Sequence, residues 1–283
     1  MDTNYTVSQD SFEFTTMKEI IIQLLQDTGY LVDLNTTGIA TGFDKVDAIA
    51  KGFQIGEVSV IASKPGNGKT AFLLSLLFNI ASKSGKAVGV FSPERSSAKM
   101  FSRLIESETR HSLKKIAAHD LKDSEKEQVN AILYNLSKAE IFVDDSIRLS
   151  KEEFQKRCKQ LRNKFGVDII FVDSFELFSC KHLEDEQNND EHKNTLNDIK
   201  LMAKELGIPI VVFSHLVNSS HISDIPSIEN IADYILDVAD NVFIIHRQTG
   251  DKAVFMIAKH KNITIPQIIN LKFIESIDKF VDL

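Results

Sequence analysis

Hydrophobic and polar positions along this chain predict strands and helices in alternation from about residue 38 onward. Short apolar runs typical of buried strands fall at 58–62, 87–91, 140–143, 168–172, 208–213, 241–245, 253–258 and 268–273. Helical runs lie between many of them, at 70–83, 96–109, 123–136, 150–164 and 192–206. Near-continuous apolar strands that alternate with helices predict an α/β domain whose mostly parallel sheet is covered on both faces. The last three strands follow one another without helices and predict an antiparallel meander at one edge.

The first 37 residues follow a different pattern. Residues 1–15 are polar and predict a flexible tail. Residues 16–30 predict an amphipathic linker helix, because Thr16 and Glu19 have capping-box spacing and apolar residues recur at helical intervals after them. A polar connector then leads to a domain at 38–283. The apolar stripe of this helix must be buried, either on its own domain or on a neighbouring subunit, and the sequence leaves both possibilities open.

The strongest chemical signal is the segment between the strand at 58–62 and the helix that follows it. Strand, short loop, Gly-Lys-Thr and helix form the context of a phosphate-binding P-loop, in which unpaired backbone N–H groups surround a phosphate. Lys69 is expected to reach the β and γ phosphates, and the Thr70 hydroxyl to hold Mg²⁺. One position departs from the usual pattern, since a serine replaces the first glycine. The expected nucleotide-binding residues are Ser63, Pro65, Gly66, Asn67, Gly68, Lys69, Thr70 and Ala71.

Two carboxylates at predicted strand ends suit hydrolysis of a bound nucleotide. Asp173 ends the apolar run 168–172 in a Walker B pattern, so we expect it to bind Mg²⁺ near Thr70, because ligands of open α/β sheets sit beyond the carboxyl ends of the strands. Glu94 follows the strand at 87–91, which could lie beside the P-loop strand, and its carboxylate can orient or activate water. Glu176 is a rival for this role.

Further polar residues follow later strands. His215 ends the strand at 208–213 and is a candidate sensor of the γ-phosphate, although a structural histidine fits equally well. Lys259 and Lys261 end a late strand, and Arg247 ends another. Cations of this kind stabilise the transition state of phosphoryl transfer, in some rings by reaching the site of the next subunit. From spacing alone, Arg247, Lys259 and Lys261 are interpreted as ordinary solvated basic residues.

Composition limits the remaining possibilities. Of the 283 residues, 43% are hydrophobic and 26% charged, and the net charge is −7. This balance is typical of a globular protein and argues against a generally basic nucleic-acid coat, without excluding a local basic channel. The two cysteines provide neither a disulfide framework nor zinc spacing. The polar N-terminus does not resemble a secretory signal, and no apolar run reaches membrane-spanning length, so we expect a cytoplasmic protein.

Several of these segments, in this order, resemble the C-terminal RecA-like ATPase domain of DnaB-type replicative helicases. The resemblance runs from about residue 17 to the end and includes the entry segment 38–47, the segment 52–57 and the P-loop with Pro65. It continues through 91–94, the Asp144-Asp145 pair, Asp173 and 214–216 to the strand end at 258–262 and the terminus at 278–283. The early helix resembles the linker helix that docks on the adjacent subunit in helicase rings.

The resemblance implies ATP and Mg²⁺ as cofactors and a ring of six subunits around single-stranded DNA, with ATP bound between subunits. It implies that Glu94 activates water, that His215 occupies a position usually held by glutamine, and that Lys259 and Lys261 act across the subunit interface. Arg247 and Lys259 are also expected to contact the nucleotide. Interaction with replication partners is a further implication; no membrane role is expected.

The chain also departs from the family pattern. Lys261 stands at the arginine-finger position, where lysine keeps the charge but loses the planar two-pronged geometry. The loop at 181–191 is acidic, and the loop at 217–224 contains neither arginine nor lysine. Such loops release few counterions and should bind DNA weakly. A helicase or translocase is therefore the first hypothesis, a nucleotide-binding scaffold without unwinding is the alternative, and a RecA-type recombination ATPase is a third.

Overall fold

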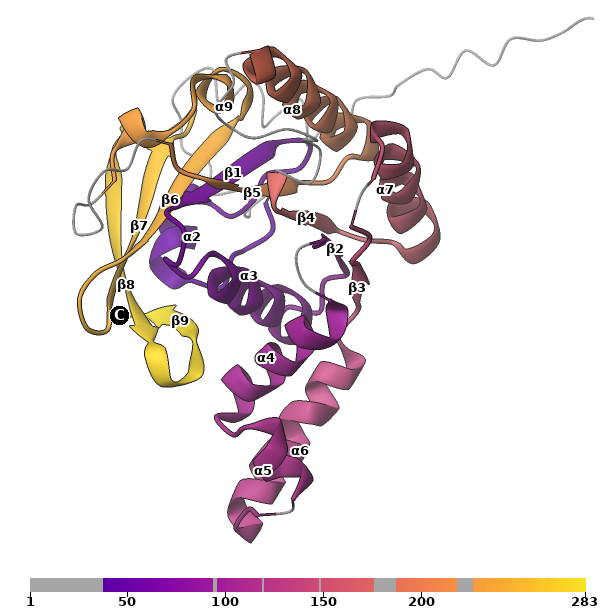
Figure 1. Cartoon of the computed structure of the whole chain (residues 1–283), viewed down its shortest axis with the longest axis vertical. Coiled ribbons are helices and arrows are strands. Elements are labelled where there is room, and N and C mark those ends of the chain that lie inside the picture. Colours follow the sequence, from indigo (N-terminus) through magenta and orange to yellow (C-terminus); the bar gives the residue numbers. More distant parts are fainter. Residues whose placement is uncertain (1–37, 94–95, 119, 148, 176–186, 218–225) are drawn as a thin grey trace, which may run out of the picture. The chain divides into compact units, whose positions relative to one another are not determined.

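The computed structural model describes residues 38–93, 96–118, 120–147, 149–175, 187–217 and 226–283. The predicted tail at 1–15 and linker helix at 16–30 lie outside this part of the chain. Within it, strands and helices alternate as the hydrophobic pattern predicts (Figure 1).

A nine-stranded sheet forms the centre of the described domain. Its strands are β1 (Val58–Ser63), β2 (Val88–Phe91), β3 (Ile141–Asp144), β4 (Ile169–Asp173), β5 (Ile210–His215), β6 (Asn241–Arg247), β7 (Lys252–Lys259), β8 (Gln267–Ile274) and β9 (Lys279–Asp282). They lie in the order β3-β2-β4-β5-β1-β6-β7-β8-β9. Neighbours from β3 to β6 pair in parallel, and β6 to β9 form an antiparallel meander, which confirms the predicted mixed α/β sheet.

One possibility that the sequence offered is wrong. The strand at 87–91, now β2, could have lain beside the P-loop strand β1, yet the two sides of β1 are taken by β5 and β6. β2 instead lies between β3 and β4, with Phe91 aligned to Val172. Proximity in sequence does not determine neighbours in a parallel sheet, because each crossover helix can carry the chain past several strands. The segment after β2 therefore emerges next to Asp173 rather than next to the P-loop strand.

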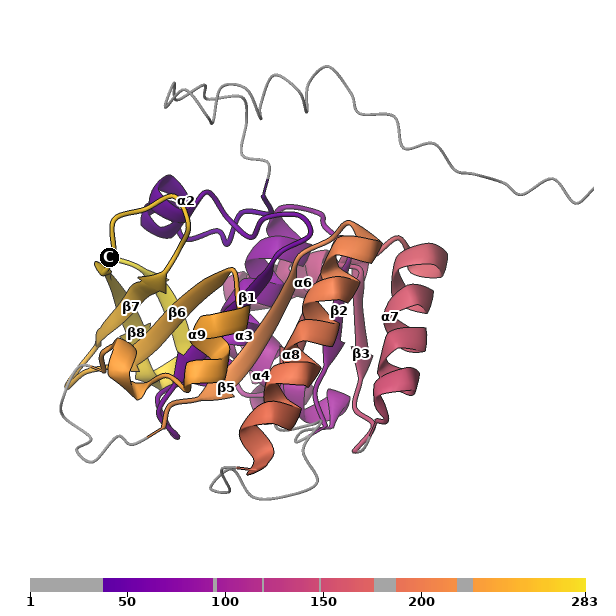
Figure 2. The same cartoon turned by 90° about the horizontal axis from the view of Figure 1, so that it is seen from above.

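Helices cover both faces of the sheet (Figure 2). Their bounds are α2 (Asp44–Ala50), α3 (Lys69–Leu77), α4 (Ser97–Thr109), α5 (Leu113–Ala117), α6 (Asp123–Lys138), α7 (Lys151–Phe165), α8 (Gln187–Leu206) and α9 (Asp233–Val238). A π-helical turn at Phe78–Lys83 continues α3. One core contains α2, α3, α4 and the meander, and a second contains α7, α8 and α9. The strands from β1 to β6 contribute side chains to both, which explains their near-continuous apolar sequences.

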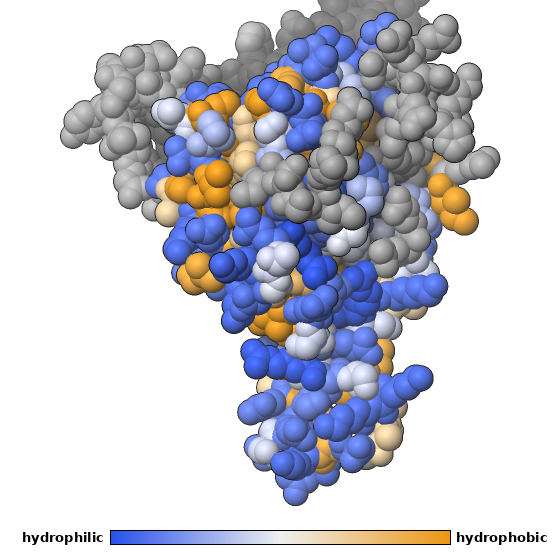
Figure 3. Space-filling model, turned by 60° about the vertical axis from the view of Figure 1, so that its left-hand side comes forward, coloured by the Kyte–Doolittle hydropathy of each residue, from blue (hydrophilic) through white to orange (hydrophobic). Residues whose placement is uncertain are grey.

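No helix within the described ranges is long and apolar enough to cross a membrane. The face shown in Figure 3 is mainly polar, and the apolar residues on it occur in small separate groups. Exposed apolar residues scattered in this way are ordinary for a folded domain.

Candidate nucleotide site

The P-loop connects the end of β1 to the start of α3. Gly66 and Gly68 have φ angles of +75° and +87°, which favour glycine. No atom lies within 4 Å of the position that a Cβ of Gly66 would take, so the loop is open there. Gly68 is the N-cap of α3, whose first residues are Lys69 and Thr70. The free N–H groups of this helix start, next to an open glycine turn, are suited to bind phosphate.

The departure at the first glycine position has a local explanation. Ser63 is the last residue of β1 and pairs with His215 on β5 and Ile245 on β6. It is absent from the described non-glycine residues with positive φ, so this position makes no demand for glycine. Its hydroxyl is buried and has no hydrogen-bond partner within the described residues. Serine is therefore compatible with this backbone and leaves a polar atom at the base of the loop.

Lys69, Asp173 and His215 meet at the carboxyl edge of the sheet, although the sequence separates them widely. The Lys69 Nζ lies 3.8 Å from Asp173 Oδ1 and 3.2 Å from His215 Nε2. Only 10% of the Lys69 side chain and 3% of the Asp173 side chain are exposed. An ammonium group has no lone pair, so the imidazole Nε2 must accept in this contact. The three residues form a shielded charged cluster beside the helix start.

Asn67 fastens the P-loop to the neighbouring strand. Its side-chain oxygen accepts a hydrogen bond from the Arg247 backbone N–H at the end of β6, at 3.0 Å. The Arg247 guanidinium lies over the Phe273 ring, 3.7 Å from its centroid, and pairs with Glu275 at 3.3 Å. Arg247 thus lies at the edge of the P-loop, and its side chain is held by the C-terminal strands.

The C-terminal strand also contacts the P-loop, a feature that sequence reasoning did not identify. A Cβ built on Gly68 would lie 2.9 Å from the ring of Phe280, which is 1% exposed. The Phe280 N–H donates to the Ser75 hydroxyl on α3 at 3.2 Å, and its ring packs edge-on against Phe72. The available signal in the sequence was an aromatic residue, Phe280, in the short terminal segment 278–283.

Lys259 and Lys261 lie on the side of the sheet where the parallel strands begin, opposite to the P-loop at their carboxyl ends. β7 runs antiparallel to β6, so Lys259 is aligned with Val242 near the start of β6. The six residues of β1 span about 20 Å at about 3.3 Å per residue, which sets the scale of the separation from Lys69. Neither lysine is brought together with the P-loop of its own chain.

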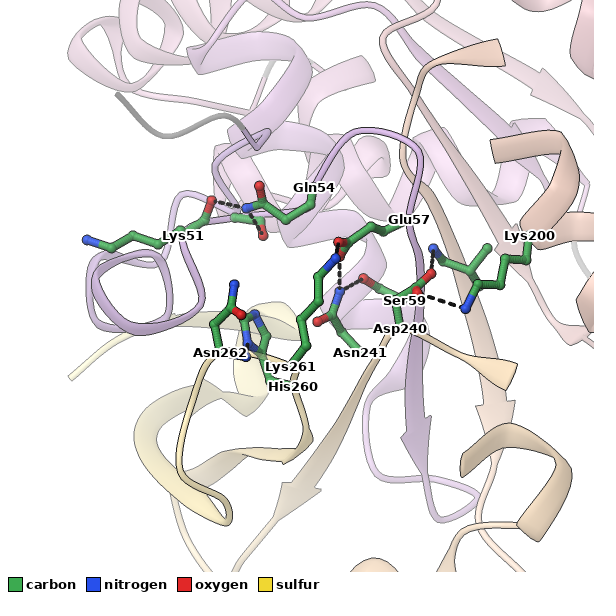
Figure 4. A network of polar contacts seen from close by, with 12 residues as sticks. Lys51, Gln54, Glu57, Ser59, Lys200, Asp240, Asn241, His260, Lys261 and Asn262 are labelled. Carbon is green, nitrogen blue, oxygen red and sulfur yellow. Dashed lines mark hydrogen bonds and ion pairs between the residues drawn. The ribbon is translucent and has the colours of Figure 1, made fainter. Parts of the chain in front are cut away.

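Backbone carbonyl oxygens hold Lys259 in place. Its Nζ donates to the carbonyl oxygens of Leu236 and Ala239 at the end of α9, at 2.5 and 2.6 Å. Burial, and then the nearby Lys200 ammonium, lower the pKa of Lys259. Lys261 is different, because its side chain is 58% exposed and forms an ion pair with Glu57 at the start of β1 (Figure 4).

Two candidate carboxylates, Glu94 and Glu176, lie outside the described residues. The described segment that leads to Glu94 nevertheless ends beside Asp173, because Phe91 is aligned with Val172. Ser92, the next residue, is fully buried, and its hydroxyl has no hydrogen-bond partner among the described residues.

The donor atoms at the carboxyl edge fit Mg²⁺. The Thr70 hydroxyl and the Asp173 carboxylate would supply hard oxygen ligands if the ion bound here, and Mg²⁺ in nucleotide sites typically takes one or two protein oxygens with phosphate and water. No group of three or more potential His, Cys, Asp or Glu ligands occurs in the described part of the chain. The site therefore suits an ion that arrives with a phosphate rather than an all-protein metal centre.

Comparisons with known proteins agree with this geometry. A family profile described as "DnaB-like helicase C terminal domain" matches residues 38–282. "Replicative DNA helicase DnaB" of Geobacillus stearothermophilus is 27% identical over 95% of this chain and 62% of its own length. "Probable replicative DNA helicase" of Guillardia theta is 33% identical over 69% of this chain and 33% of its own length.

A solved structure supports the fold. A structure described as an "ATPase Domain" superposes with a TM-score of 0.80, at 22% identity, over 96% of this chain and all of its own. The chain spans about three fifths of the length of the Geobacillus relative. The matched region contains the P-loop, the Asp173 strand and the lysines at the end of β7. The chain therefore belongs to the DnaB-like helicase C-terminal domain family and contains a P-loop NTPase domain.

Proposed function

We propose that this chain hydrolyses ATP with Mg²⁺ at the interfaces of a homo-oligomeric ring, most simply a hexamer, and couples hydrolysis to movement along single-stranded DNA. The observation that carries the proposal is the division of charged residues between two edges of one sheet. Lys69, Thr70 and Asp173 lie at the carboxyl edge, and Lys261 lies at the other edge with its side chain exposed. A cation that cannot reach its own P-loop is available to the P-loop of a neighbouring copy.

The residues at the carboxyl edge have distinct roles in this proposal. Backbone N–H groups from Gly66 to Thr70 bind the phosphates, and the Lys69 ammonium moves from Asp173 to the β and γ oxygens. Thr70 and Asp173 would hold Mg²⁺, which would supply positive charge beside the transferred phosphoryl group. His215, which already contacts Lys69, senses the γ-phosphate.

Two roles complete the reaction. Glu94 accepts the proton of the attacking water, and Lys261 of the adjacent subunit offsets charge on the transferred phosphoryl group. Lys259 supports the end of β7 rather than contacting phosphate directly, because its ammonium already has two carbonyl partners and a lowered pKa. Arg247 borders the P-loop, where its backbone N–H binds Asn67, and in this proposal it contacts the nucleotide. The movement on DNA is inferred from relatives that are named replicative DNA helicases.

The test is steady-state ATP hydrolysis by the full chain with and without single-stranded DNA, alongside Lys69→Ala. We expect DNA to stimulate turnover and the substitution to abolish it. Light scattering of the chain with ATP and Mg²⁺ should give the mass of a ring. A monomer at every concentration would contradict catalysis across an interface, and turnover that persists in Lys69→Ala would contradict the assigned site.

The second candidate is a nucleotide-binding scaffold of helicase type that does not unwind DNA. The observation that favours it is the sequence of the loops expected to face DNA, since 181–191 is acidic and 217–224 lacks arginine and lysine. These loops lie mainly outside the described residues. Nucleotide binding and assembly without any response to DNA would favour the scaffold. A structure related to this fold is described with "Its Interactions With Primase", so a primase-type protein is a reasonable partner to test for either function.

A further inference from the structure

The ion pair between Lys261 and Glu57 connects the end of β7 to the start of the P-loop strand. Glu57 precedes β1, and Lys261 belongs to the turn after β7. Figure 4 shows the Lys261 side chain extended toward Glu57 from the adjoining strand end. The Lys261 side chain is 58% exposed, whereas the Glu57 side chain is 11% exposed. A nearly buried anion thus holds a cation at the surface.

The Glu57 carboxylate is itself fixed. One of its oxygens pairs with Lys261, and the other accepts a hydrogen bond from the Asn241 side chain at 2.9 Å. Asn241 is 2% exposed, and its amide also approaches the Ser59 hydroxyl at 3.4 Å. The carboxylate therefore has one orientation in which both oxygens are used, and the Lys261 ammonium is directed by a rigid partner.

His260, the neighbour of Lys261, does not compete for Glu57 near neutral pH. Burial lowers the pKa of His260, which favours its uncharged form. Its Nδ1 accepts a hydrogen bond from the Asn262 backbone N–H at 3.2 Å, which stabilises the turn that carries Lys261. The lysine is left as the cation that meets the carboxylate.

We propose that Glu57 is a positioning residue for Lys261, which holds the ammonium at the subunit surface in the orientation that the neighbouring nucleotide site requires. The inference rests on the proposed function, since it concerns hydrolysis across an interface. Lysine is a point charge on a flexible stem and lacks the fixed fork of arginine. An oriented carboxylate beneath it supplies the geometry that the side chain lacks. A partly exposed pair is weak enough for the ammonium to shift toward a phosphate when one is presented.

The opposite effect would follow if Glu57 sequestered Lys261. A bound carboxylate neutralises the ammonium and would have to be removed before catalysis, so loss of Glu57 would then accelerate hydrolysis. Positioning predicts slower hydrolysis. The direction of the change in kcat therefore separates the two roles of the same contact.

The experiment measures ATP hydrolysis by Glu57→Gln, Glu57→Asp and the wild type, with ring mass and Tm recorded for each protein. We expect Glu57→Gln to lower kcat by about 10- to 100-fold, the range caused by displacement of a catalytic group by about 1 Å, with KM for ATP nearly unchanged. Glu57→Asp should recover part of the loss. Tm should fall by only a few degrees, because glutamine keeps an acceptor for the Asn241 side chain and the lost partner, Lys261, is mostly exposed to solvent.

Two further proteins distinguish positioning from general damage. In Lys261→Ala, adding Glu57→Gln should cause no additional loss of kcat, because the residue to be positioned is gone. The matched control is Glu205→Gln, which removes an exposed ion pair with Lys159 between α7 and α8 and should leave kcat unchanged.

The outcomes separate the two proposals. A wild type that does not hydrolyse ATP, or a Lys69→Ala variant that does, overturns the proposed function. An active wild type whose kcat is unchanged or raised in Glu57→Gln overturns the positioning role alone. Equal losses of kcat in Glu57→Gln and Glu205→Gln would also overturn it.

Discussion

Replacing Gly68 with alanine tests the contact between the P-loop and the C-terminal strand. The residue has a φ of +87°, and a Cβ there would lie 2.9 and 3.0 Å from two atoms of the Phe280 ring and 3.2 Å from Arg247 Cδ. Contacts below 3.0 Å require the neighbour to move, and Phe280 is buried by Phe72 and Phe273. The substitution therefore combines backbone strain with steric overlap.

The two costs can be sized separately. A left-handed backbone costs a non-glycine residue about 1–2 kcal/mol, and overpacking a well-filled core costs about 1–3 kcal/mol. Gly68→Ala should therefore reduce the free energy of unfolding by about 2–5 kcal/mol, and lower Tm by roughly 4–20 °C for a domain of this size. Gly166→Ala is the matched control, because Gly166 has a φ of +66° and no atom within 4 Å of the added Cβ.

Urea unfolding of the full chain without nucleotide measures both variants. The difference between Gly68→Ala and Gly166→Ala isolates the overlap and should be about 1–3 kcal/mol. Adding Phe280→Leu to Gly68→Ala should recover part of that difference, giving a favourable coupling energy in a double-mutant cycle. Equal costs at the two glycines, or additivity within about 0.5 kcal/mol, would refute the claim that β9 packs against the P-loop.

Three further substitutions or treatments test other parts of the structure. Lys279→Ala should cost about 3–5 kcal/mol at pH 7.5, because it leaves the nearly buried Glu108 carboxylate without its lysine. Burial already raises the Glu108 pKa above 4.5, so protonation of this carboxylate favours the folded state, and stability falls as the pH rises from 4.5 through the folded pKa. The difference in Tm between Lys279→Ala and the wild type should therefore be smaller at pH 5 than at pH 7.5. A difference that does not change with pH would contradict this explanation. Cys158 is 0% exposed, and burial raises the pKa of its thiol. Iodoacetamide should therefore alkylate Cys158 only after urea is added, as measured by mass spectrometry. Rapid alkylation of the folded protein would contradict the burial of this thiol. Ser150→Ala removes the capping box that Ser150 forms with Glu153 at the start of α7. It should lower the free energy of unfolding by about 1 kcal/mol without changing KM for ATP. An unchanged urea midpoint would contradict a stabilising role of this cap.

Hydrophobic periodicity was sufficient to predict the alternation of elements, because buried parallel strands and amphipathic helices carry different repeats. The predicted strand at 58–62 became β1 at Val58–Ser63, and the predicted helix at 150–164 became α7 at Lys151–Phe165. The order of strands could not be predicted in the same way, because it depends on which faces pack together after each crossover. For this reason the position of β2 in the sheet could not be predicted from the sequence.

The short strand β9 was missed for a related reason. Its four residues, Lys279–Asp282, are too few to show a hydrophobic repeat, and contacts with residues far away in the sequence hold the strand in place. Phe280 packs on α3, Lys279 pairs with Glu108, and Asp282 accepts from the Asp44 N–H at 3.0 Å. Tertiary contacts therefore determine this strand, and local propensity contributes little.

The candidate site divides in the same manner. Lys69, Asp173 and His215 could be grouped from sequence because each lies at or just after the carboxyl end of a parallel strand, and these ends share one edge of the sheet. The pairing of Glu57 with Lys261 could not, since it joins side chains more than two hundred positions apart at an edge where no motif directs attention. The role of Glu94 stays a prediction.

The arrangement of the two edges has a consequence for assembly under the proposed function. β1 carries the P-loop at its carboxyl end and begins next to Glu57, so one short strand separates the nucleotide site of a subunit from the cation offered to its neighbour. In a two-fold dimer every contact is reciprocal, so each Lys261 could meet the partner's P-loop only if one interface patch contained both edges. A head-to-tail contact needs one edge from each subunit, and it produces either a closed ring or an open filament. Under the proposed function, the separation of Lys69 from Lys261 along β1 therefore favours a heterologous interface over a two-fold one.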